Sequence, residues 1–117
     1  MPKVMIVDNE RTTAMLLQTL LELDGFEAVV APNGKDALQK AVQATPDIFL
    51  VDYRLDDMNG VDLIRELRAL DPFTKTPIVM ASGMNVEDEA RSAGASLFLI
   101  KPIDPSILGR TLRSLIT

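Results

Sequence analysis

Short apolar runs recur along the chain, separated by longer stretches of mixed polarity. The runs are KVMIV (residues 3–7), EAVVA (27–31), DIFLV (47–51), PIVMA (77–81) and LFLI (97–100). Runs of this length that are rich in Val and Ile are typical of strands buried on both faces of a sheet. The pattern therefore predicts five strands.

Between the runs, apolar residues recur at helical spacing. Three stripes consist of Ala14, Leu17 and Leu21; of Ala37, Leu38, Ala41 and Val42; and of Val61, Ile64, Leu67 and Leu70. VEDEARSAG (86–94) predicts a fourth helix, because its first turn is acidic and a glycine ends it. Asp104 and Pro105 suit the N-cap and first position of a fifth helix. Five strands alternating with five helices predict an α/β fold with a parallel sheet covered on both faces.

The composition of the chain excludes several classes of protein and several kinds of functional site. The 117 residues, 47% hydrophobic and 25% charged, predict one globular domain over residues 1–117. The absence of Cys and His excludes disulfides, thiolate metal sites, His-based triads and phosphohistidine on this chain. A net charge of −5 argues against direct nucleic-acid binding. Because neither a signal-peptide pattern nor a membrane-length apolar run is present, we expect a cytoplasmic protein without membrane contact.

Polar side chains stand where most of the apolar runs end. The residues at these five positions are Asp8, Ala31, Asp52, Ser82 and Lys101. The carboxyl ends of parallel strands share one edge of the sheet, where ligands of open α/β sheets bind. A single Asp or Ser at a strand end is more often a turn residue. The set as a whole predicts a crevice in which the Asp52 carboxylate meets Lys101 and a cation.

Four motifs resemble the receiver domain of two-component response regulators. They are VDNE (7–10), LVDYRLDDMNG around Asp52, MASG around Ser82 and LFLIKPID around Lys101. The resemblance covers essentially the whole chain, and the order and spacing of the motifs make it specific. It implies a flavodoxin-like (βα)5 three-layer sandwich with a parallel five-stranded sheet in the order 2-1-3-4-5.

The resemblance implies a magnesium site. Asp8, Asn9, Asp52 and the backbone carbonyl of Arg54 would supply its protein ligands. Mg2+ prefers oxygen ligands and keeps several of its waters, so a few protein oxygens suffice. The resemblance therefore names Mg2+ as the expected cofactor.

The resemblance also assigns roles in phosphoryl chemistry. Asp52 would be the phosphoacceptor, assisted by Ser82 and Lys101, and Lys101 would precede a cis peptide bond to Pro102. Phe98 would be the switch aromatic that follows Ser82 when Asp52 is phosphorylated. Phosphoryl transfer needs mainly positioning and charge neutralisation, which a metal ion and an ammonium provide.

The implied function is that of a phosphoacceptor in a two-component phosphorelay. A histidine kinase or histidine phosphotransferase would donate the phosphoryl group, and a changed surface would act on a downstream effector domain or protein. A homodimer is also compatible with the resemblance. The domain would assist its own phosphorylation and dephosphorylation without being a conventional enzyme.

Three features depart from the receiver pattern. Asn9 stands where receivers usually have a second acidic residue, which predicts weaker Mg2+ binding unless Glu10 compensates. Asp56 stands where receivers often have Pro, and Arg54 could shield an acyl phosphate, reach a partner or simply be solvated. The segment between Ser82 and Lys101 is about three residues shorter than expected, so we expect a fourth helix about one turn short.

Two other functions stay open. A degenerate receiver would act as a phosphorylation-independent interaction module, which Asn9 and the short fourth helix favour and Asp52, Ser82 and Lys101 oppose. A flavodoxin-like small-molecule binder is disfavoured, because no glycine-rich phosphate loop follows the first strand. The chain could be a stand-alone receiver or one domain of a longer protein.

Overall fold

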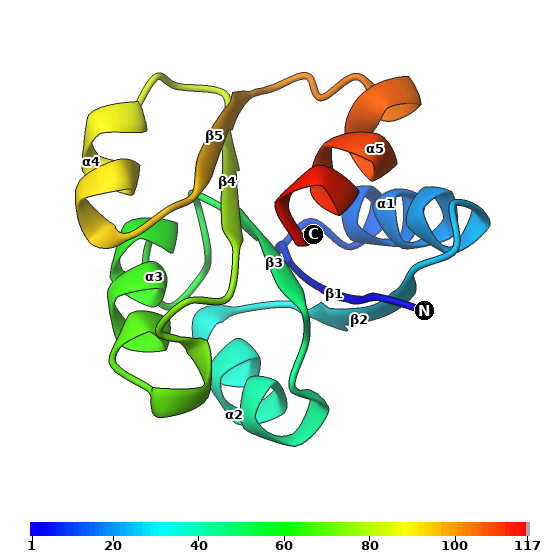
Figure 1. Ribbon diagram of the computed structural model, residues 1–117. Helices are drawn as coiled ribbons and strands as arrows, with labels where there is room; N and C mark the ends of the chain where they lie inside the picture. Colours follow the sequence, from blue (N-terminus) through cyan, green and yellow to red (C-terminus); the bar gives the residue numbers. More distant parts are fainter. Residues whose placement is uncertain (117) are drawn as a thin grey trace.

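The computed structural model describes residues 1–116, in which strands and helices alternate along the chain (Figure 1). The strands are β1 (Lys3–Val7), β2 (Glu27–Ala31), β3 (Ile48–Asp52), β4 (Ile78–Ser82) and β5 (Leu97–Ile100). The α-helices are α1 (Arg11–Leu23), α2 (Gly34–Ala44), α3 (Gly60–Arg68), α4 (Glu87–Ala93) and α5 (Pro105–Ile116). A short 3-10 helix, η1 (Asp71–Phe73), follows α3. The predicted elements are thus all present, and η1 is an addition to them.

The five strands form one parallel sheet in the order β2-β1-β3-β4-β5. This is the order that the resemblance implied. The chain leaves β1 for β2 on one side and then crosses to β3 on the other side of β1. Strand order therefore reverses between β1 and β3, and the carboxyl ends of these two strands flank the point where ligands bind in such sheets.

Helices cover both faces of the sheet. Side chains of α1 and α5 pack on one face in a core that includes Ile6, Leu50 and Leu108. Side chains of α2, α3 and α4 pack on the other face around Phe49 and Ile64, and Figure 1 shows these two groups of helices on opposite sides. The central strands β1, β3 and β4 are buried on both faces as predicted, whereas the edge strands β2 and β5 are partly exposed.

Local side-chain and backbone signals mark the starts of α2, α3 and α5 and the end of α4. The side-chain oxygens of Asn33 and Asn59 accept hydrogen bonds from the third residue of α2 and α3. Asp104 accepts one from the backbone of Ser106 at the start of α5. Gly94 ends α4 with a φ of +117°, which favours glycine. At seven residues, α4 is the shortest of the described α-helices.

Within residues 1–116, every helix falls short of the length and apolar character that crossing a membrane requires.

Candidate functional site

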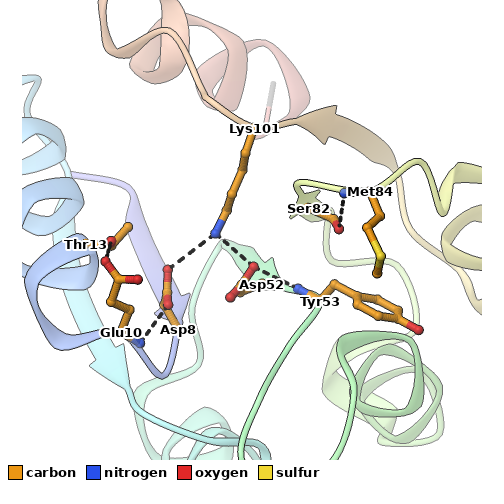
Figure 2. Close-up of polar contacts among 8 residues, drawn as sticks. All are labelled: Asp8, Glu10, Thr13, Asp52, Tyr53, Ser82, Met84 and Lys101. Carbon is orange, nitrogen blue, oxygen red and sulfur yellow. Dashed lines mark hydrogen bonds and ion pairs between the residues drawn. The ribbon is translucent and has the colours of Figure 1, made fainter.

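The carboxylates of Asp8 and Asp52 lie at the carboxyl ends of two paired strands. Val7 and Val51 are partners in the β1–β3 ladder, so the next residue on each strand lies at the same edge of the sheet. Lys101 reaches this edge from the end of β5. Its Nζ lies 2.9 Å from Oδ1 of Asp52 and 3.9 Å from Oδ2 of Asp8 (Figure 2). The expected meeting of Asp52 with Lys101 is therefore confirmed.

Asp8 is a buried carboxylate, with only 4% of its surface exposed. The backbone N–H of Glu10 donates a hydrogen bond of 2.9 Å to its Oδ1. Burial raises the pKa of Asp8 above its ordinary value and outweighs the lowering by the Glu10 N–H; Asp52 raises this pKa further and Lys101 lowers it. A cation bound here would relieve a carboxylate that is costly to keep ionised.

The two carboxylate oxygens of Asp52 have different surroundings. Oδ1 accepts hydrogen bonds from Lys101 Nζ at 2.9 Å and from the backbone N–H of Tyr53 at 3.0 Å. Within residues 1–116, both donors to this carboxylate contact Oδ1, so Oδ2 has no protein donor. Figure 2 shows the Tyr53 ring directed away from the carboxylate.

Ser82 ends β4 and is buried, with its Oγ accepting a 3.0 Å hydrogen bond from the backbone N–H of Met84. Phe98 is buried in the core under α3 and α4. It is the ladder partner of Met80, which lies two residues before Ser82. Because side chains alternate between faces along a strand, Phe98 and Ser82 share one face of the sheet. The peptide bond between Lys101 and Pro102 is cis.

The loop after Asp52 is held closed at both ends. The N–H of Gly60 donates to the carbonyl of Tyr53 at 2.7 Å, and Arg54 forms an isolated antiparallel bridge with Asn59. The loop carries the Arg54 carbonyl that is expected to bind Mg2+. Its place beside Asp52 is thus set by backbone contacts rather than by side chains alone.

Asp57 ties the same loop to α2. Its carboxylate accepts hydrogen bonds of 2.9 Å from the backbone N–H groups of Gly34 and Lys35, at the start of that helix. These two hydrogen bonds lower the pKa of Asp57 below its ordinary value. The sequence did not predict this contact, because residues 34 and 57 share no local motif.

Asp56 makes a different contact, which the sequence also did not predict. Its Oδ1 accepts a 3.0 Å hydrogen bond from the side-chain amide of Asn9, and both residues are exposed. Arg54 is exposed as well, and its guanidinium lies 3.6 Å from the sulfur of Met84. Two positions that depart from the receiver pattern, 9 and 56, therefore contact each other, and Arg54 lies in the same loop as Asp56.

The available donors suit Mg2+ better than a softer metal. Residues 1–116 hold no group of three or more His, Cys, Asp or Glu side chains arranged for a metal ion. A cation at this edge would instead be bound by the carboxylates of Asp8 and Asp52, the amide oxygen of Asn9 and a backbone carbonyl. Mg2+ accepts such a sparse set of oxygens because it keeps several waters.

Comparison with known proteins gives one consistent result. Residues 4–113 match the family described as response regulator receiver domain. The chain is 37% identical over 106 residues to the chemotaxis protein CheY of Thermotoga maritima, covering 89% of this chain and 88% of that one. It is 36% identical over 105 residues to the regulatory protein AtoC of Escherichia coli, of which it spans only 22%. The solved structure of CheY4 from Vibrio cholerae matches with a TM-score of 0.92 at 29% identity, covering 98% of each chain.

Proposed function

The chain belongs to the response regulator receiver domain family, and we propose that Asp52 accepts a phosphoryl group in a Mg2+-dependent step of a two-component phosphorelay. The observation that carries the proposal is the Lys101 ammonium 2.9 Å from Asp52, at the switch point of the sheet. Because this chain has no His, a phosphohistidine donor must reside on a partner, a histidine kinase or histidine phosphotransferase.

Asp52 would act as the nucleophile through Oδ2, the oxygen that receives no hydrogen bond from the described residues 1–116. The new bond joins Oδ2 to phosphorus while the phosphorus–nitrogen bond of the donor breaks, and the electron pair leaves with the donor imidazole. The Lys101 ammonium would offset the charge that builds on the phosphoryl oxygens. Bound Mg2+ would supply further charge neutralisation, held by Asp8, Asn9, Asp52 and the Arg54 carbonyl.

Ser82 and Phe98 would carry the signal away from Asp52. The phosphoryl group adds strong acceptors and up to two negative charges, which draw the Ser82 hydroxyl from its contact with the Met84 N–H. Movement at the end of β4 frees space on the face that Phe98 shares. A turn of this ring would alter the surface of α4 and β5, to which an effector domain or protein binds.

We infer that residues 1–117 are one receiver domain, which promotes its own phosphorylation and is not a conventional enzyme. Relatives such as AtoC are several times longer than this chain, so the activity of any larger protein is a separate question. The alternative is the phosphorylation-independent interaction module, which a direct phosphorylation assay distinguishes from the phosphoacceptor.

The decisive experiment is phosphorylation by acetyl phosphate, followed by intact mass. We expect one phosphoryl increment that requires Mg2+, disappears with a chelator and is absent from Asp52→Ala. Asp88→Ala, which removes an exposed carboxylate on α4, is the matched control and should be modified normally. If wild type gains nothing even at high Mg2+ and also fails to bind fluoroberyllate, the interaction module replaces the phosphoacceptor.

A further inference from the structure

Asn9 and Asp56 form a side-chain pair that links the segment after β1 to the loop after Asp52. The Asn9 amide nitrogen lies 3.0 Å from Oδ1 of Asp56, and 47 residues separate the two in sequence. An ionised carboxylate only accepts hydrogen bonds, so Asn9 must present its NH2 group to Asp56. The carbonyl oxygen of a planar amide then lies on the other side of Cγ. Asp56 thus decides which atom of Asn9 is available as a metal ligand.

The pair also restores a charge. Asp8 and Asp52 contribute two negative charges at the edge of the sheet, and Lys101 offsets one of them. A neutral amide at position 9 adds nothing to this balance, whereas the Asp56 carboxylate in contact with that amide adds one negative charge. A divalent cation bound to Asn9 would therefore have a third carboxylate directly behind its amide ligand.

We propose that Asp56 is a positioning residue of the magnesium site. It orients the Asn9 carbonyl oxygen toward the ion and supplies, from behind this ligand, the negative charge that the amide lacks. The inference rests on the proposed function, since it assumes that Asp8, Asn9 and Asp52 bind Mg2+. Partners of metal ligands act in this way because they fix a ligand's orientation and raise its donor strength.

The neighbouring Asp57 provides a matched control. It carries the same charge in the same loop, but its carboxylate binds the backbone at the start of α2. If the charge of the loop affected Mg2+ affinity only in a general way, removing the charge of Asp56 or of Asp57 would weaken Mg2+ binding equally. If the effect acts through Asn9, only removal of the Asp56 charge weakens Mg2+ binding.

The test is calorimetric titration of Mg2+ into the intact chain at constant ionic strength. Asp56→Asn keeps an acceptor for Asn9 and removes only the charge, whereas Asp56→Ala removes both. We expect about tenfold weaker Mg2+ binding for Asp56→Asn and a larger loss for Asp56→Ala, with at most twofold change for Asp57→Asn. Wild-type affinity in Asp56→Asn, or an equal loss in Asp57→Asn, would overturn the inference.

An exchange of the two side chains distinguishes a role in Mg2+ binding from a purely structural role of the pair. The double variant Asn9→Asp with Asp56→Asn moves the carboxylate to position 9 and the amide to position 56, with the hydrogen bond reversed. We expect it to bind Mg2+ at least as tightly as wild type, and failure to recover from the loss in Asp56→Asn counts against the inference.

Asp8→Asn separates this inference from the proposed function. If wild type binds Mg2+ through Asp8 and accepts phosphate while Asp56→Asn is unaffected, only the inference fails. If wild type shows no saturable Mg2+ binding, or binding that does not need Asp8, the magnesium site and the inference fail together.

Discussion

The ammonium of Lys101 lies 2.9 Å from Oδ1 of Asp52 but 3.9 Å from Oδ2 of Asp8, so it is hydrogen-bonded to one carboxylate and only near the other. Asp52 thus has one carboxylate oxygen engaged, while the other receives no hydrogen bond from residues 1–116. Asp8 is the more deeply buried of the two and has the weaker contact with the cation. The same ammonium would compete with Mg2+ for both carboxylates and assist phosphoryl transfer.

Lys101→Met should therefore separate metal binding from phosphorylation. Removal of the ammonium leaves two carboxylates without their cation, so we expect tighter Mg2+ binding in calorimetry. Phosphorylation by acetyl phosphate at saturating Mg2+ should nevertheless slow by about tenfold or more, because one stabilising charge is lost in the transition state. Lys75→Met, at an exposed position before β4, should behave as wild type. A Lys101→Met variant phosphorylated at the wild-type rate would contradict the role given to this lysine.

Asp8→Asn should stabilise the metal-free fold. The pKa of Asp8 is raised by burial, so the folded state binds a proton more readily than the unfolded state does. Protonated Asp8 therefore does not destabilise the fold at low pH. Its contribution to the free energy of unfolding is lost as pH rises from about 3.8 through the higher folded-state pKa. At neutral pH with a chelator, we expect urea unfolding to show a higher free energy of unfolding for Asp8→Asn than for wild type.

Asp88→Asn is the control for that measurement, because it removes an exposed carboxylate and changes the net charge equally. The difference between Asp8→Asn and wild type should shrink when unfolding is repeated at acidic pH, where Asp8 is already protonated. A variant that is less stable than wild type at neutral pH would show that the buried carboxylate is compensated by its hydrogen bond and by Lys101.

Gly60→Ala should damage the loop that follows Asp52. A Cβ at this position would lie 2.4 Å from the carbonyl oxygen of Asp52 and 2.7 Å from Cε of Met80. The backbone oxygen cannot yield without moving Asp52, so we expect a loss of about 1–3 kcal/mol in unfolding free energy, together with weaker Mg2+ binding. Gly83→Ala is the matched control, since nothing lies within 4 Å of a Cβ there. Equal stability of the two variants would refute the steric argument.

Arg68→Lys should destabilise the fold, because the Arg68 guanidinium connects three backbone carbonyls at the opposite end of the sheet. Arg68 donates to the carbonyls of Gly94, Phe73 and Thr76 at 2.6–3.1 Å, and burial lowers its pKa without a carboxylate partner contributing. An ammonium cannot span the three acceptors, so we expect a loss of about 1–3 kcal/mol in thermal or urea unfolding.

The control for this variant is Arg65→Lys, which lies on the same helix and forms an exposed pair with Asp62. Exposed ion pairs contribute little to stability, so the unfolding free energy of Arg65→Lys should differ from that of wild type by less than about 0.5 kcal/mol. If Arg68→Lys were as mild as Arg65→Lys, water would have to satisfy the three carbonyls equally well.

Local sequence patterns were sufficient to predict the five strands, the five α-helices and the members of the central cluster. Strand and helix positions follow from local periodicity, and Asn33, Asn59 and Asp104 mark helix starts through contacts that span only two or three residues. The pairing of Asp52 with Lys101 follows from the sequence pattern, because parallel strands place their carboxyl ends at one edge. The order of the strands came from the family resemblance, since periodicity does not specify which strands are neighbours.

The contacts between loop residues, in contrast, depend on the tertiary structure. Asp56 and Asp57 are adjacent and chemically identical, yet one binds the side chain of Asn9 and the other binds the start of α2. The positions of these partners depend on how β1, α2 and β3 are placed by the packed sheet, and no local pattern encodes that placement. For the same reason, the amide at position 9 appeared in the sequence as a lost charge, and the carboxylate that contacts it became visible only in the folded chain.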